Sequence, residues 1–136
     1  MKKAKWLLCV TITLLLLGCT ITTTKTKDPV FTDIDRVQNE LGNLVKAANI
    51  NLNGKEITTN KKTRCELEVA ITNGVNIPTG DDERRSLGKS IAVSIKHNLK
   101  DPNEFDDYKV LFVTKIESGA VTKRNWVGDV FSSTEL

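Results

Sequence analysis

The apolar residues between Thr32 and Ala48 recur every three or four positions, which is the spacing of a helix that buries one face. Thr32 and Asp35 stand in the S/T-x-x-D/E relation of an N-terminal cap, and Asn49 provides a stop signal. We therefore predict an amphipathic helix over Asp33–Ala48.

A second helical pattern covers Asp81–Lys100. Its apolar residues repeat at every fourth position: Leu87, Ile91, Ile95 and Leu99. Carboxylates at the start of the segment and basic side chains at its end complement the helix dipole. Asp101-Pro102 closes the segment, because the residue before a proline avoids the helical conformation.

Alternation of the half-buried strand type predicts a hairpin between the two helices. We pair Ile50–Thr58 with Cys65–Thr72 through a polar turn at Thr59–Thr63. A tight turn at Asn53-Gly54 is the alternative. We prefer the longer hairpin, with a bulge at Gly54, because the alternative leaves strands of only about three residues.

The last segment alternates in the same way and predicts a second hairpin. One strand is Tyr108–Ile116, the turn is Glu117–Ala120, and the return strand is Val121–Phe131, with Trp126 and Val130 on one of its faces. The order is therefore helix, hairpin, helix, hairpin, which indicates the α+β class. We expect one four-stranded, mostly antiparallel sheet with both helices on one face.

The chain opens with three lysines, Lys2, Lys3 and Lys5, followed by an apolar stretch from Trp6 to Gly18. A basic start, an apolar centre and small residues at the exit are the parts of a secretory signal peptide. A transmembrane helix is the alternative, but the stretch is shorter than the roughly 17 apolar residues that a span requires.

The signal ends in Leu16-Leu17-Gly18-Cys19, which resembles the lipobox of bacterial lipoproteins. The resemblance implies cleavage between Gly18 and Cys19 and attachment of a diacylglyceryl group to the Cys19 thiol, often with acylation of the new amine. Two or three acyl chains hold a protein firmly on a membrane. Thr20 is not the aspartate that retains enteric-type lipoproteins in the inner membrane, so the outer membrane is favoured in a cell with two membranes.

Removal of residues 1–18 changes both the net charge and the number of available cysteines. The formal charge of +3 comes from the discarded lysines, so the mature chain is neutral and we expect no nucleic-acid partner. Cys9 is discarded and Cys19 is lipidated, which leaves Cys65 without a disulfide partner.

The mature part is long enough for one domain. We divide the chain into the signal peptide (1–18), the lipidated cysteine with a flexible threonine-rich tether (19–31), a single α+β domain (32–132) and a C-terminal tail (133–136).

No catalytic constellation is visible in the sequence. His97 is the only histidine and falls in the last turn of a predicted helix, where it serves as a C-terminal cation. Cys65 alternates with apolar residues and turns inward as a structural thiol. The acidic run Asp101–Asp107 lacks the glycine and the distal glutamate of a calcium-binding EF-hand loop. We therefore predict that the protein is no enzyme and holds no metal or cofactor.

The sheet face left uncovered by the helices is a candidate partner surface. The first hairpin offers Glu66, Glu68 and Thr72 to it, and the second hairpin offers four cations, subject to its register: Lys109, Lys115, Lys123 and Arg124. A mixed-charge face of this kind is either a binding surface or merely a solvated one.

In size and helix–hairpin pattern, the body is similar to small uncharacterised lipoproteins of the bacterial envelope. We therefore expect a non-catalytic, lipid-anchored binding or assembly module with a protein partner in the envelope. The alternative is a lipoprotein that binds a small ligand or inhibits a hydrolase. That alternative predicts an apolar pocket or a rigid protruding loop, for which Asn73–Gly80 is the candidate.

Overall fold

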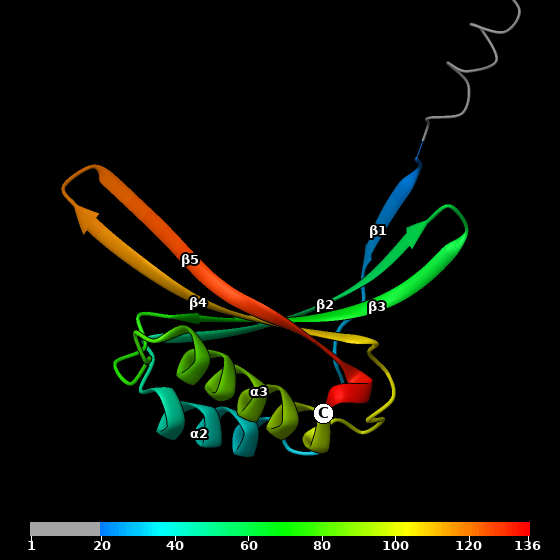
Figure 1. The fold of residues 1–136 in the computed structure, drawn as a ribbon, viewed down its shortest axis with the longest axis horizontal. Helices are drawn as coiled ribbons and strands as arrows, with labels where there is room; N and C mark the ends of the chain where they lie inside the picture. Colours follow the sequence, from blue (N-terminus) through cyan, green and yellow to red (C-terminus); the bar gives the residue numbers. More distant parts are fainter. Residues whose placement is uncertain (1–19) are drawn as a thin grey trace, which may run out of the picture.

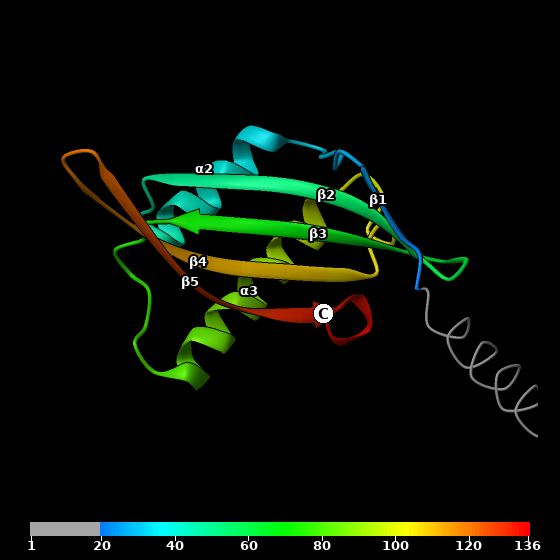
Figure 2. The same ribbon diagram turned by 90° about the horizontal axis from the view of Figure 1, so that it is seen from above.

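The structure is a computed structural model that describes residues 20–136. The signal peptide and the lipobox cysteine predicted above lie outside the described residues. A five-stranded sheet is covered on one face by two helices (Figures 1 and 2). In chain order the elements are β1 (Thr22–Thr26), α2 (Ile34–Val45), β2 (Asn49–Thr59), β3 (Lys62–Thr72), α3 (Asp81–Asn98), β4 (Asp107–Ser118), β5 (Val121–Ser132) and the 3-10 helix η2 (Ser133–Glu135).

The α+β class is confirmed, but the predicted four-stranded, mostly antiparallel sheet is wrong. The sheet has five strands in the order β1-β2-β3-β4-β5, and it is mixed because β3 and β4 run parallel. The parallel pair arises from α3, which carries the chain back along the sheet so that β4 starts at the same end as β3 (Figure 1). Such a return through a helix joins neighbouring strands in parallel.

The fifth strand, β1, occupies residues that the sequence analysis assigned to a flexible tether. It pairs antiparallel with the outer half of β2, from Thr22 opposite Thr59 to Thr26 opposite Lys55. Threonine is β-branched and suits a strand. All five residues of β1 are exposed, so no apolar alternation marks the strand in the sequence.

Both helices bury their apolar stripes on the same face of the sheet (Figure 1). The core is built from α2, α3 and alternate residues of the central strands: Val37, Leu41, Val45, Leu67, Val69, Ile71, Ile91, Ala92, Ile95, Tyr108, Val110 and Phe131. Residue 33 is the N-cap of α2, with its side chain accepting from the backbone N–H of Arg36 at 3.0 Å, so the predicted cap at Thr32 is displaced by one residue. The helix ends at Val45 because Lys46 is left-handed, with φ of 44°.

The longer first hairpin is confirmed by the register, in which Thr59 pairs with Lys62. The turn consists of Asn60 and Lys61 alone, both with positive φ, which is the conformation of a tight type I′ turn. The predicted bulge is absent, because Gly54 pairs with Leu67 in an unbroken register.

Tyr108 is the only tyrosine of the chain and lies fully buried in the core. Its hydroxyl has no hydrogen-bond partner among the described residues. Burial, together with the nearby negative charges of Glu104 and Asp101, raises the pKa of Tyr108 from its usual 10.0 to about 12.

We expect the alkaline stability of the protein to reflect this tyrosine. Between pH 10 and about 12 the unfolded chain loses the Tyr108 proton while the folded protein keeps it, so the free energy of unfolding falls as pH rises. Tyr108→Phe removes this loss and, by deleting an unpaired buried hydroxyl, stabilises the fold by about 1 kcal/mol at neutral pH. Urea unfolding across this pH range checks both effects, and an unchanged alkaline loss in the variant would contradict them.

Candidate partner-binding surface

The two hairpins extend past the helices at opposite ends of the molecule. The β2–β3 turn lies beside β1 at one end, and the β4–β5 turn lies at the other (Figures 1 and 2). Beyond the helices a strand has no core to face, so its side chains on both sides are available to solvent or to a partner.

The β4–β5 hairpin carries a concentration of exposed apolar side chains. We call five of them the β4–β5 surface: Ile116, Val121, Trp126, Val127 and Val130. Trp126 and Val121 are 69% and 68% exposed. Tryptophan is enriched at the centres of protein interfaces.

The register distributes the β4–β5 surface over both faces of the sheet. Trp126 lies opposite Val113, on the open face of the sheet away from the helices. Val130, four residues later in β5, lies on the same face. The alternation of the strand predicted that these two residues share a face. The other three residues face the helix side: Ile116, Val121 and Val127. The hairpin therefore exposes apolar side chains on both of its faces.

The predicted charged face is assembled with one exception. Glu66, Glu68 and Thr72 lie on the open face, and the register adds three of the four predicted cations: Lys109, Lys115 and Arg124. Lys123 pairs with Ile116 and therefore lies on the opposite face. Alternation alone left this choice open because it depended on the register of the hairpin.

Glu68 lies at the centre of the charged row. Its Oε2 is 3.1 Å from the Nζ of Lys55 and 3.1 Å from the Nζ of Lys109, on the two flanking strands. Partial burial raises the pKa of the Glu68 carboxyl, but the hydrogen bonds and positive charges of the two lysines outweigh it and hold the pKa below the usual 4.5. The carboxyl ties three neighbouring strands together across the open face.

We expect Glu68→Gln to remove part of the acid sensitivity of the fold. In the native protein the depressed pKa adds stability above about pH 4.5, and this stability is lost as pH falls and the folded carboxyl is protonated. The free energy of unfolding of the variant should be about 1 kcal/mol lower than that of the native protein at neutral pH. It should also decrease less steeply toward pH 3. Urea midpoints at both pH values test this, with Glu117→Gln as the control. Lys115 also lowers the pKa of Glu117, but this pair is exposed at the end of β4, so the control should change stability little. Parallel acid profiles for native protein and Glu68→Gln would be the contrary result.

Cys65 is half-buried and packs against the core, as its alternation predicted. The neighbour of this thiol was not predicted from the sequence. The Nζ of Lys27 lies 3.4 Å from the Cys65 Sγ and 3.2 Å from the backbone carbonyl oxygen of Glu104. Lys27 follows β1, and only the pairing of β1 with β2 brings it here.

The remaining sequence candidates lie apart from one another. His97 is exposed in the last turn of α3. In the acidic loop, the Asp106 carboxylate accepts the backbone N–H of Cys65 at 2.7 Å, and Asp101 accepts that of Asn103 at 2.9 Å. Within residues 20–136, no three metal-ligating side chains are close enough to hold an ion.

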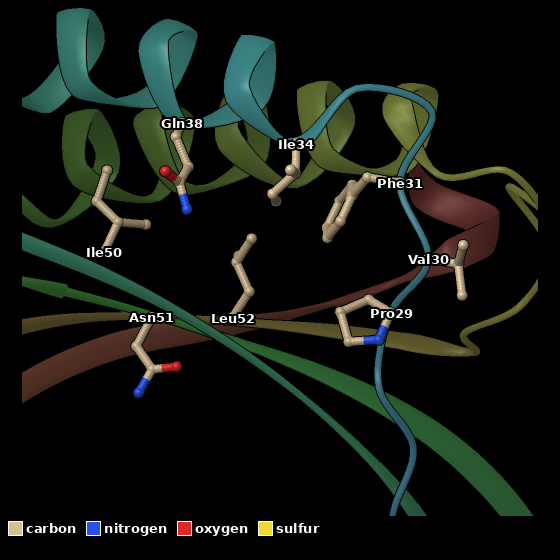
Figure 3. Close-up of a pocket in the computed structure, with 8 residues that line it drawn as sticks. All are labelled: Pro29, Val30, Phe31, Ile34, Gln38, Ile50, Asn51 and Leu52. Carbon is tan, nitrogen blue, oxygen red and sulfur yellow. The ribbon is translucent and has the colours of Figure 1, made fainter.

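An apolar groove lies where β1 leaves the sheet (Figure 3). Phe31 and Ile34, at the entry to α2, face Ile50 and Leu52 of β2 across a cavity of about 500 Å³. β1 pairs only with residues 55–59 of β2, so the preceding part of that strand edge has no strand beside it. The sequence did not predict this groove, because it depends on where β1 ends.

No protein-family model, curated protein or solved structure matches this chain. Among the described residues, none of the helices is long and apolar enough to cross a bilayer.

Proposed function

We propose that this protein is a lipoprotein of the bacterial envelope, anchored through Cys19, that acts as a non-catalytic binding or assembly module. The observation that supports the binding role most directly is Trp126, an indole 69% exposed on the open sheet face. Its apolar neighbours on the hairpin add contact area on both faces, and Lys115 and Arg124 provide a polar rim. An apolar centre with a charged rim is the usual anatomy of a protein interface.

The position of the hairpin fits an anchored protein. β1, which follows the proposed lipid site, lies at one end of the molecule, and the β4–β5 turn lies at the opposite end (Figures 1 and 2). Lipid at Cys19 would therefore leave the β4–β5 surface pointing away from the attachment point. A partner could reach both faces of the hairpin without displacing the anchor.

Crosslinking in intact cells tests this function. A lysine-reactive crosslinker reports on neighbours of the hairpin through Lys115 and Lys123. We expect a specific partner in stoichiometric yield and, in the same mass spectra, a mature N-terminus at lipidated Cys19. A chain that stays solitary would contradict the binding role, and an N-terminus without lipid would contradict the anchor.

The groove of Figure 3 favours a second candidate function, the binding of a small apolar ligand. Its volume of about 500 Å³ is in the range of small-molecule sites, and aliphatic and aromatic side chains line it together with the amides of Gln38 and Asn51. Leu52→Asp would place a carboxylate against Ile34 and should abolish such binding. Lipid-extractable small molecules found on the purified native protein, and absent from this variant, would support the candidate.

A further inference from the structure

The β2–β3 turn lies at the point where the chain emerges from the proposed lipid site. The backbone N–H of Asn60 donates to the carbonyl oxygen of Ile21 at 3.3 Å, and Thr22 pairs with Thr59. Ile21 is only two positions after Cys19, and two residues span at most about 7 Å. A lipid on Cys19 therefore holds the turn within a few ångströms of the membrane surface.

The β2–β3 tip, together with β1 beside it, is basic. The residues of β1 and of the β2–β3 tip (residues 56–64) include four cations and one carboxylate: Lys25, Lys61, Lys62, Arg64 and Glu56. Arg64 pairs with Asp107 at 3.3 Å, and the register sets Lys25 opposite Glu56. Lys61 and Lys62 are exposed and form no ion pair with any described residue.

Lys61 has a conformation that the turn itself does not favour for lysine. It occupies the second position of a type I′ turn with φ of 66°, where glycine is the usual residue because a side chain is strained there. The turn therefore carries an exposed cation at its tip, where glycine would cost less.

We propose that the β2–β3 tip docks on anionic phospholipid headgroups of the bilayer that carries the Cys19 anchor, with Lys61 and Lys62 as its contact residues. The proposal rests on the lipid attachment proposed above. The anchor supplies proximity, and each lysine near an anionic surface strengthens association about fivefold. Docking of the tip fixes the orientation of the molecule and keeps the β4–β5 turn, at the other end, away from the bilayer (Figure 1).

Amine footprinting of the full lipoprotein tests the proposal. The protein is reconstituted in phosphatidylcholine vesicles with or without phosphatidylglycerol, treated with an amine-reactive reagent, and read by mass spectrometry. We expect Lys62 to react about fivefold more slowly on the anionic vesicles. Its reactivity should return in about 1 M salt, where charges are screened within about 3 Å. Lys123, on the distal hairpin, is the internal control and should react equally on both vesicles.

Two glycine variants distinguish the effect of a cation at the β2–β3 tip from the effect of a cation elsewhere on the protein. Lys61 and Lys46 both have positive φ, so Lys61→Gly and Lys46→Gly each relieve a strained position and each remove one cation. Both should raise the thermal midpoint, which shows that they fold. Only Lys61→Gly should reduce, at least twofold, the protection of Lys62 from the amine-reactive reagent on anionic vesicles.

The outcomes distinguish this proposal from the proposed function. Equal reactivity of Lys62 on both vesicles, with lipid present on Cys19, would overturn docking of the tip and leave the anchor intact. A mature N-terminus without lipid, visible in the same spectra, would overturn the anchor and the docking together. Equal effects of the two glycine variants would overturn the role of Lys61.

Discussion

Gly54→Ala should destabilise the fold by about 3 kcal/mol, the upper end of what overpacking a core costs. A Cβ at residue 54 would lie 2.0 Å from the backbone carbonyl oxygen of Lys27 and 2.8 Å from Cε1 of Phe105. The first atom belongs to the segment that holds β1 on the sheet, and the second to a buried core ring. Neither can move without breaking the contact that Gly54 permits. The urea midpoint of the variant measures the loss.

Gly42→Ala provides the matched control. It is the same substitution, but no atom lies within 4 Å of the Cβ it would add in the middle of α2. Alanine is favoured over glycine inside a helix, so this variant should gain about 0.5–1 kcal/mol. A similar change in stability at the two positions would contradict the close packing of Lys27 and Phe105 against Gly54.

Trp126→Ala should weaken partner binding by about 30-fold, which corresponds to about 2 kcal/mol, while the free energy of unfolding changes by less than about 0.5 kcal/mol. The variant should affect binding much more than stability because the indole is exposed and contributes little to the core. Its loss removes the largest side chain of the β4–β5 surface. Recovery of the crosslinked partner and urea unfolding measure the two effects.

Leu44→Ala is the control for this prediction. Leu44 is also an exposed large apolar residue, but it lies on α2 rather than on the β4–β5 hairpin. Its truncation should leave partner recovery unchanged. Equal loss of partner from both variants would show that binding does not depend on the β4–β5 surface.

The elements with a buried face could be predicted from the sequence, and the strand without one could not. α2, α3 and the two hairpins each place alternate or every third to fourth residue in the core, and this leaves a period in the sequence. β1 is exposed along its whole length and depends on backbone hydrogen bonds to β2. Its composition of threonine and lysine is equally compatible with a tether.

The candidate sites divide in the same way. Alternation was sufficient to place Trp126 and Val130 on one face, because face follows from position within a strand. Assignment of Lys123 required the hairpin register. The contact of Lys27 with Cys65 and the contact of Ile21 with the β2–β3 turn both depend on β1 and could not be predicted without it. Non-local strand pairing is therefore the information that the sequence pattern lacked.

The central claim is that an anchored module binds a partner through the β4–β5 surface. Site-specific photocrosslinking in intact cells tests it most directly. A photoreactive p-benzoylphenylalanine replaces Thr122, on the same face of β5 as Trp126, or Asn43, on the exposed side of α2. We predict one dominant crosslinked protein from position 122, lost in Trp126→Ala, and none from position 43. The same crosslinks from both positions, or none from position 122, would contradict the account.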